Sequence, residues 1–345
     1  MDKICIVIGA RPNFMKAYPL CCEFDKRGIE YNIFHSGQHY DKEMNDTFMD
    51  FFKFKNLKNI HIQPGNKIRD LQHIMYCFKE YLIETNPKTV ILLGDVDTTY
   101  VCSLVAKSLN KVVVHVEAGL RSFDSDMPEE KNRITVDHLS DILFSPTHES
   151  EHNLYDENVS GKVFMVGNIM IDCLIKSLPL IKQEVKNSNV IVTFHRPENV
   201  DTNNIFILVD ELRRLSYNFQ VIFPMHPRTR KRMEELNLIS RLSKVDIVKP
   251  MGYIDFINLV YNAYAVITDS GGIQEETTYL NIPCFTVRKS TERPITITEG
   301  TNHIIALGDI VNNVINAKRG EHKIPKFWDG KTAERIVDIL QKEAL

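Results

Sequence analysis

The chain carries short apolar runs, rich in β-branched residues, that are bounded by turn residues. Most of these runs are continuous rather than alternating, which indicates strands buried on both faces of a parallel sheet. Between them, apolar residues recur at three- and four-residue spacing, as in 206–215 and 256–264, and this spacing predicts amphipathic helices. We expect strands at residues 4–8, 31–34, 90–93, 112–116, 142–144, 163–166, 190–194, 221–223, 245–248, 265–268 and 284–287.

The alternation of strands and helices predicts βαβ units and therefore an α/β protein with doubly wound parallel sheets. A polar stretch at 182–189 follows a helical segment, and it indicates a linker within about 170–188. We expect two Rossmann-like domains that face each other across a cleft, residues 1–170 and 171–331. The amphipathic segment 332–345 is expected to form a last helix that packs back on the first domain. A length of 345 residues suits two domains.

The composition is that of a globular protein without nucleic-acid or membrane partners. Hydrophobic residues make up 43% of the chain and charged residues 25%, with a net charge of −3. No basic stripe indicates nucleic-acid binding. No apolar run reaches the roughly 18 residues that a membrane span needs, and the short apolar run at the start does not resemble a signal peptide. We therefore expect a cytoplasmic protein.

Cysteine and metal patterns do not point to a metal site. The seven cysteines include no C-x-x-C pair and are expected to be reduced packing residues. Residues 148–152 match the H-x-x-E-H pattern of some zinc proteases, and 95–97 match a D-x-D pattern. The acids of the first pattern suit a helix N-terminus, and the second lacks further hard ligands. No metal and no cofactor are expected.

Unusual residues gather where the predicted strands end. Ligands of open α/β sheets bind beyond the carboxyl ends of the strands. Six predicted strands, from both halves of the chain, run directly into clusters of Asp, Glu, His, Arg or Gly. These clusters are expected to line the cleft, and they lie at residues 9–16, 94–99, 117–121, 195–199, 226–227 and 269–276.

The turn Ser270-Gly271-Gly272 opens a predicted helix directly after a strand. Free backbone N–H groups and the helix dipole at such a turn form an anion site, and Glu276, one turn later, could accept hydrogen bonds from ribose hydroxyls. The alternative is an ordinary tight turn. Arg11 and Lys16 flank another strand-to-helix turn, where the alternative is a solvated basic pair. The segment around Arg11 and Lys16 is not the G-x-G-x-x-G dinucleotide fingerprint, and no P-loop motif occurs, so an NAD-dependent enzyme of the Rossmann type is not expected.

Four strand-end or helix-start groups could transfer protons: Asp95, Glu117, Glu129 and His195. Carboxylates that share one site push their pKa values apart, which allows one to act as an acid and another as a base. For each of them the alternative is a capping residue or a structural ion pair.

Taken together, the motifs resemble those of the non-hydrolysing UDP-N-acetylglucosamine 2-epimerases, which have the GT-B fold of many glycosyltransferases. The resemblance covers nearly the whole chain and keeps the order of the motifs. It implies reversible epimerisation of UDP-N-acetylglucosamine to UDP-N-acetylmannosamine, by elimination of UDP and its re-addition to a 2-acetamidoglucal. The matching segments are 9–16, 36–40, 94–95, 117–121, 127–133, 193–196, 226–227, 270–276 and 291–294.

The resemblance also implies roles for individual residues. The acid–base set would be Asp95, Glu117 and Glu129, with Arg133 and His195 in support. The UDP contacts would be Arg11, Lys16, His226, Ser270, Gly271, Gly272, Glu276 and Arg293. Bacterial members can use a second UDP-N-acetylglucosamine as an activator, and its site would include Gln38, His39, Arg69 and Glu130. The family further implies a homodimer and a role in polysaccharide biosynthesis.

The chain departs from the family pattern at several positions. Leu93 stands where many members have His, and Val96 and Asp97 follow the Gly-Asp pair where a Thr-rich run is common. Ile295 stands where many members have Glu. The alternatives are therefore an epimerase of a related UDP-2-acetamido sugar (a diacetamido uronate or a deoxysugar), a GT-B glycosyltransferase, a hydrolysing epimerase and a UDP-sugar sensor.

Overall fold

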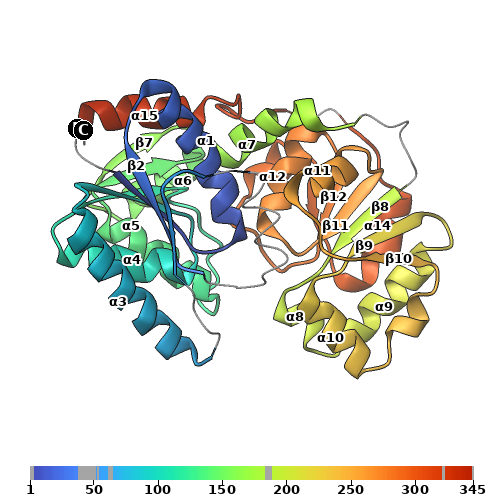
Figure 1. Ribbon diagram of the computed structural model, residues 1–345. Helices are drawn as coiled ribbons and strands as arrows, with labels where there is room; N and C mark the ends of the chain where they lie inside the picture. The colour runs from blue at the N-terminus through green and yellow to red at the C-terminus, as the bar shows by residue number, and fades with distance from the viewer. Residues whose placement is uncertain are drawn as a thin grey trace. The chain divides into compact units, whose positions relative to one another are not determined.

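The computed structural model describes residues 4–37, 52, 54–60, 65–182, 189–320 and 323–343. Gln38 and His39, two residues of the predicted activator site, lie outside these ranges. The chain forms two compact units. The first unit comprises Met1–Lys176 together with Lys326–Leu345, and the second comprises Ser177–Pro325 (Figure 1).

The first unit is built on a seven-stranded parallel sheet with the strand order β3-β2-β1-β4-β5-β6-β7. Its strands are β1 (Ile4–Ile8), β2 (Tyr31–His35), β3 (Leu57–Asn59), β4 (Thr89–Leu93), β5 (Val112–Val116), β6 (Ile142–Ser145) and β7 (Lys162–Met165). Its helices are α1 (Arg11–Arg27), α3 (Lys67–Thr85), α4 (Asp97–Ser108), α5 (Pro128–Leu139), α6 (His148–Asp156), α7 (Ile169–Ser177) and α15 (Thr332–Glu343).

The second unit is built on a six-stranded parallel sheet with the order β10-β9-β8-β11-β12-β13. The strands are β8 (Asn189–Thr193), β9 (Gln220–Pro224), β10 (Val245–Val248), β11 (Ala265–Thr268), β12 (Cys284–Thr286) and β13 (Asn302–Ile304). The α-helices are α8 (Pro197–Val200), α9 (Asn204–Leu215), α10 (Pro227–Glu235), α11 (Tyr253–Tyr261), α12 (Gly271–Leu280), α13 (Ile295–Thr298) and α14 (Ile310–Ile315). The predicted architecture of two parallel-sheet α/β domains is confirmed.

All eleven predicted strands are present, to within one or two residues at their ends. The prediction was wrong in omitting β3 and β13, which lie at sheet edges and contain only three residues each. Their sequences, LKN and NHI, hold a single apolar residue apiece. An edge strand packs on only one neighbour, so it needs no continuous apolar run that sequence analysis could detect.

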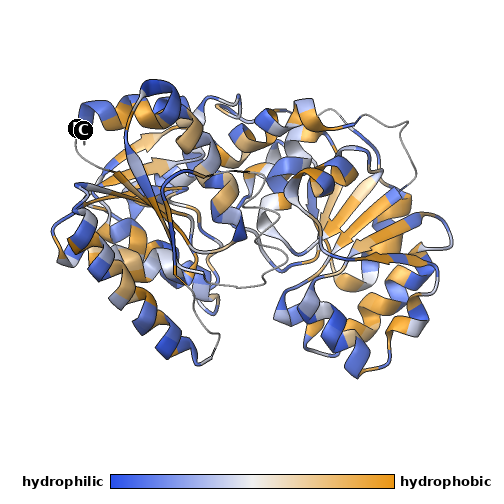
Figure 2. Cartoon of the chain, in the orientation of Figure 1, coloured by the Kyte–Doolittle hydropathy of each residue, from blue (hydrophilic) through white to orange (hydrophobic). Residues whose placement is uncertain are grey.

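The burial of the central strands explains why their sequences are continuously apolar. All five residues of β1 and of β4 are buried, because helices cover both faces of the sheet. Figure 2 shows the same contrast in each unit, with strands almost uniformly apolar and helices apolar on one side. In the first unit, Phe34 of β2 packs against Phe78 and Tyr81 of α3, with ring centroids 4.8 and 5.3 Å apart. Such contacts orient each helix, and with it the loop that precedes the helix.

The C-terminal helix α15 packs against α1 in the first unit (Figure 1). Arg27 of α1 pairs with Asp338 at 2.5 Å, and Lys162 of β7 pairs with Glu343. At the start of α15, the backbone N–H of Ala333 donates to the buried carboxylate of Asp172 in α7, at 2.8 Å. In the described part of the chain, no helix is long and apolar enough to cross a membrane.

Gly167, between β7 and α7, is predicted to be required for the first unit. Its φ is +97°, and a Cβ there would lie 2.2 Å from the carbonyl oxygen of Phe327. Gly167→Ala should therefore destabilise the unit by about 2–5 kcal/mol, from backbone strain and overpacking together. Gly28→Ala is the control, because φ there is +65° but no atom lies within 4 Å, so only the strain of about 1 kcal/mol applies.

The measurement is urea unfolding followed by the fluorescence of Trp328, which is buried in the first unit and is the only tryptophan of the sequence. Equal midpoints for the Gly167 and Gly28 variants would contradict the proposed clash.

Candidate active site

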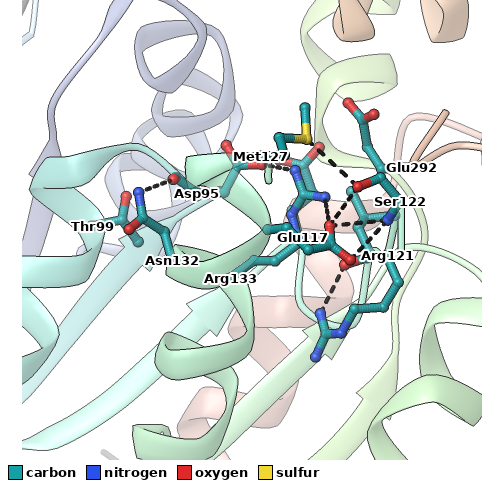
Figure 3. Close-up of polar contacts among 12 residues, drawn as sticks. Asp95, Thr99, Glu117, Arg121, Ser122, Met127, Asn132, Arg133 and Glu292 are labelled. Atoms are coloured by element: carbon teal, nitrogen blue, oxygen red, sulfur yellow. Dashed lines mark hydrogen bonds and ion pairs between the residues drawn. The ribbon is translucent and has the colours of Figure 1, made fainter. Parts of the chain in front are cut away.

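The turn after β4 presents Asp95 to a charged group on α5. Arg133 uses one guanidinium nitrogen to bind the Asp95 carboxylate and the other to bind Glu130 at 2.5 Å, as Figure 3 shows for Asp95 and Arg133. Asn132, next to Arg133, donates to the backbone carbonyl of Asp95 at 3.0 Å. Two consecutive residues of α5 therefore hold the backbone and the carboxylate of Asp95.

The turn after β5 presents Glu117, whose φ of +72° is unusual for a residue with a side chain. Its carboxylate forms an ion pair with Lys16 of α1, and both side chains are buried. Gly94 joins this pair to Asp95, since a Cβ at position 94 would lie 2.6 Å from Lys16 Nζ and 3.2 Å from Glu117 Oε2. Lys16, Glu117 and the Gly94-Asp95 turn thus form one cluster at the carboxyl edge of the first sheet.

Asn13 explains why α1 begins where it does. Its side-chain oxygen accepts hydrogen bonds from the backbone N–H groups of Gly9 and Ala10, at 2.9 and 3.0 Å, while its amide donates to the Leu93 carbonyl at 2.8 Å. This capping interaction attaches the start of α1 to the end of β4. Arg11, in the first turn of α1, is half-buried, and Lys16 lies more than one turn later.

The first turn of α5 carries two adjacent glutamates with different surroundings. Glu129 is half-buried and lies four residues before Arg133, on the same face of the helix. Glu130 is buried and accepts hydrogen bonds from the Ser122 N–H and hydroxyl and from the Phe123 N–H, at 2.8–3.0 Å. Glu130 therefore holds the loop after β5 against α5. Arg69, the other described residue of the predicted activator site, is exposed on α3.

In the second unit, Asp269 at the end of β11 organises the turn after β8. The fully buried carboxylate accepts hydrogen bonds from the backbone N–H groups of His195 and Arg196, at 2.9–3.2 Å, and contacts His195 Nδ1 at 3.1 Å. Burial alone would raise the pKa of Asp269, but His195 and the hydrogen bonds outweigh burial and lower that pKa. Because Nδ1 of His195 faces Asp269, the other ring nitrogen, Nε2, points away from this carboxylate, and the ring is partly exposed.

Ser270, Gly271 and Gly272 begin α12, and Arg293 lies against this helix start. A Cβ at position 271 would be 2.6 Å from Arg293 Nη1, so a side chain there would displace the guanidinium. Arg293 is buried and pairs with Glu292, and its Nε lies 2.9 Å from Glu275. Arg288, which also pairs with Glu292, was not among the predicted residues. It follows β12 by two residues, so the strand-end rule could have found it.

Glu276 is buried one turn into α12 and accepts a hydrogen bond from the Tyr253 hydroxyl at 2.9 Å. Burial raises the pKa of Glu276 to about 8; the Tyr253 hydrogen bond lowers that pKa and the neighbouring Glu275 raises it. His226 caps α10, its Nδ1 accepting from the Arg228 N–H at 3.2 Å, and its ring centroid lies 5.8 Å from that of His195. These groups gather at the carboxyl edge of the second sheet.

Within the part of the chain that the structure describes, no group of three His, Cys, Asp or Glu side chains is placed to hold a metal ion. The H-x-x-E-H segment begins α6, where His148 pairs with Glu151 at 3.3 Å and Thr147 caps the helix. Asp97, of the D-x-D segment, pairs instead with Lys67 at 3.0 Å and accepts from Asn132 at 3.1 Å.

Comparison with known proteins decides the family. A family model described as UDP-N-acetylglucosamine 2-epimerase matches residues 23–341. The chain belongs to the UDP-N-acetylglucosamine 2-epimerase family. It is 38% identical to the UDP-N-acetylglucosamine 2-epimerase of Methanocaldococcus jannaschii, with 98% of each chain covered. It is 31% identical to the UDP-2,3-diacetamido-2,3-dideoxy-D-glucuronate 2-epimerase of Pseudomonas aeruginosa, with 99% of each covered.

A crystal structure of the M. jannaschii UDP-GlcNAc 2-epimerase, in complex with UDP-GlcNAc and UDP, superposes with a TM-score of 0.91 at 36% identity and 99% coverage of both chains. The predicted family, its GT-B fold and the enzyme class, an epimerase, are therefore confirmed. Membership of the family does not by itself predict the hydrogen bonds and ion pairs of Asp269, Glu130 and Arg288. These contacts became visible only in the structure.

The buried Glu276 of this epimerase-family chain predicts a pH-dependent stability. Its pKa is raised from 4.5 to about 8 in the folded protein, so the folded state binds this proton more tightly than the unfolded state does. The stabilisation is complete below pH 4.5 and is lost as the pH rises through about 8. Glu276→Gln, which resembles the protonated form, should therefore gain stability relative to the natural protein across this interval.

The measurement is thermal unfolding by circular dichroism over that pH range, with Trp328 fluorescence identifying the transition of the first unit. A stability difference between the two proteins that does not change with pH would contradict the prediction.

Proposed function

We propose that the chain interconverts UDP-N-acetylglucosamine and UDP-N-acetylmannosamine by inverting C2 of the sugar. Family membership and the name of the M. jannaschii relative support this substrate. The observation that carries the proposal is the cluster at the first sheet edge, where the carboxylates of Asp95 and Glu117 lie beside the cations of Arg133 and Lys16. Two carboxylates, each held in place by a cation, suit the removal and return of a proton.

The reaction begins with loss of the C2 proton to a carboxylate of the set Asp95, Glu117 and Glu129. The C–H electrons form the C1=C2 double bond of a 2-acetamidoglucal, and the bond from C1 to the UDP oxygen breaks with its electron pair on UDP. No adjacent carbonyl acidifies the C2 proton, so departure of the pyrophosphate must supply much of the driving force. UDP then adds back to C1 as another group of the set protonates C2 from the opposite face.

Cationic and N–H donors would stabilise the charge that develops on the leaving UDP. The start of α12, at Ser270–Gly272, offers free backbone N–H groups and the positive end of the helix dipole. Arg293 lies at the same helix start, and Arg11, Lys16 and His226 would add further contacts to the phosphates. Glu276 would bind the ribose hydroxyls, and His195, oriented by Asp269, would support the proton transfers.

A related UDP-2-acetamido sugar is a second candidate substrate. The P. aeruginosa relative, 31% identical over nearly the whole chain, is named for a diacetamido glucuronate. In the second unit the side chain of Arg288 is largely buried, and burial lowers its pKa; Glu292 opposes this shift, while the neighbouring cations Arg196 and Arg293 add to it. Such a cluster of arginines could accept an additional carboxylate of a substrate. Rates of C2 exchange measured over a panel of UDP-2-acetamido sugars, with and without a carboxylate, would compare UDP-N-acetylglucosamine with the second candidate substrate.

We also propose a second UDP-N-acetylglucosamine as activator and a homodimer. The related M. jannaschii structure contains both UDP-GlcNAc and UDP. In this chain the exposed Arg69 suits binding of an anion. The Glu130 carboxylate already contacts Ser122, Phe123 and Arg133, so Arg69 supports an activator site better than Glu130 does. The exposed apolar residues Ile68, Tyr76 and Ile83 of α3 support a subunit interface there. Sigmoidal initial rates and sedimentation of a dimer would support these two proposals.

Asp95→Asn should separate proton transfer from nucleotide binding. In D₂O the natural protein should incorporate deuterium at C2 of UDP-N-acetylglucosamine, and the variant should lose on the order of 10³-fold in exchange rate, because it lacks an acid–base group. Its affinity for UDP should stay within about twofold. Glu276→Ala is the matched control, since loss of the hydrogen bonds between Glu276 and the ribose hydroxyls should weaken UDP binding by about tenfold.

Full exchange by the Asp95 variant would remove Asp95 from the mechanism. Unchanged UDP affinity in the Glu276 variant would discredit the ribose contact. If the natural protein released UDP only when an acceptor was present and without exchange, it would be a glycosyltransferase. Release of free N-acetylmannosamine would indicate a hydrolysing epimerase, and binding without exchange would indicate a sensor.

A further inference from the structure

A histidine and an aspartate that no sequence pattern singled out lie directly behind the two acid–base turns. His115 is the fourth residue of β5 and Asp137 is in α5, and both side chains are fully buried. His115 Nδ1 is 2.6 Å from Asp137 Oδ1, and His115 Nε2 is 2.9 Å from the carbonyl oxygen of Gly94. Gly94 immediately precedes Asp95.

The hydrogen bonds determine where the ring protons lie. A backbone carbonyl can only accept, so Nε2 of His115 must carry a hydrogen and donate it to Gly94. The other ring nitrogen, Nδ1, contacts the Asp137 carboxylate at 2.6 Å. The ring cannot turn over or change tautomer without losing a buried hydrogen bond, and such a loss is costly. His115 is therefore a rigid link between α5 and the carbonyl of Gly94.

The second oxygen of Asp137 links α5 to the other turn. It accepts a hydrogen bond from the backbone N–H of Gly119 at 3.1 Å and pairs with Arg121 at 2.8 Å. Gly119 has φ +80° and follows Glu117, whose φ is +72°. In addition, the N–H of Gly94 donates to Val116 at 3.1 Å, so both polar groups of the Gly94 backbone are held by β5.

We propose that His115 and Asp137 are positioning residues for the epimerisation: they hold Asp95 and Glu117 in their relative places without touching the substrate. This inference rests on the proposed function. A group that transfers a proton tolerates little displacement, and an error of about 1 Å can cost about 100-fold in rate. The loss should therefore fall on kcat, while UDP and sugar binding, which depend on other residues, should be retained.

The experiment compares Asp137→Asn, His115→Asn and His115→Gln. The Gln amide nitrogen reaches the position of Nε2 and can still donate to Gly94, whereas the shorter Asn amide reaches only the position of Nδ1. We expect Asp137→Asn and His115→Asn to lower kcat for C2 exchange by about 10- to 100-fold, with KM and UDP affinity within about twofold. His115→Gln should recover part of that rate at a similar loss of stability.

Asp172→Asn is the control for buried-core damage, because Asp172 caps α15 in the same unit and lies outside the machinery. It should lower the urea midpoint of the Trp328 transition and leave kcat unchanged. A loss of kcat in this control as large as in the His115 variants would overturn the proposal. So would full kcat in folded Asp137→Asn, or a parallel rise of KM and of the UDP dissociation constant.

Nitrogen-15 NMR supplies a readout that does not depend on turnover. The natural protein should show a slowly exchanging Nε2–H signal for His115, because this hydrogen is buried in the bond to Gly94, and its absence would overturn the proposed link. If the natural protein binds UDP without C2 exchange, the proposed function fails, and the catalytic part of this inference fails with it. If exchange is normal and His115→Asn retains it, only the positioning role fails.

Discussion

The first unit depends on the pairing of charges that its packing has removed from water. A buried ion without a partner is strongly destabilising, by about 3–5 kcal/mol when one member of a pair is removed. Lys16 pairs with Glu117, Arg133 bridges Asp95 and Glu130, and Asp137 joins His115 to Arg121. Except for Arg133–Glu130, which lies within α5, each pair joins a helix to a strand or to the turn that follows a strand, so the same interactions that keep the charges buried also fix the geometry of the turns.

These pairs give α5 a central position. Along one helix, Glu130 holds the loop at Ser122, Arg133 holds the Asp95 carboxylate, and Asp137 holds His115 and Gly119. The residues follow at intervals of three and four, so they lie along one side of the helix. A displacement of α5 would therefore move both the Gly94-Asp95 turn and the turn that carries Glu117.

The second unit contains a different arrangement, which suits the anion binding proposed for it. Its turn at Ser270–Gly272 offers backbone N–H groups, and Arg293 adds a cation that Glu275 and Glu292 hold in place. Asp269 closes β11 and anchors the turn that carries His195. The second unit thus combines a buried carboxylate, which holds the turn after β8, with hydrogen-bond donors at the start of α12.

Asp97 of the first unit departs from the family pattern by its charge. It pairs with Lys67 and accepts a hydrogen bond from Asn132.

The sequence by itself determined the parallel strands and the motif-bearing turns, since continuous apolar runs and strand-end glycines are local signals. Its strand ends located Asp95, Glu117, His195 and the Ser270–Gly272 turn. Only the tertiary structure decided which charges meet: Lys16 and Glu117 are 101 positions apart, and Asp269 lies 74 positions from His195. No local pattern encodes such pairs, because they follow from how helices pack on a sheet. The short edge strands β3 and β13 were likewise decided by pairing with a neighbour rather than by their own few apolar residues.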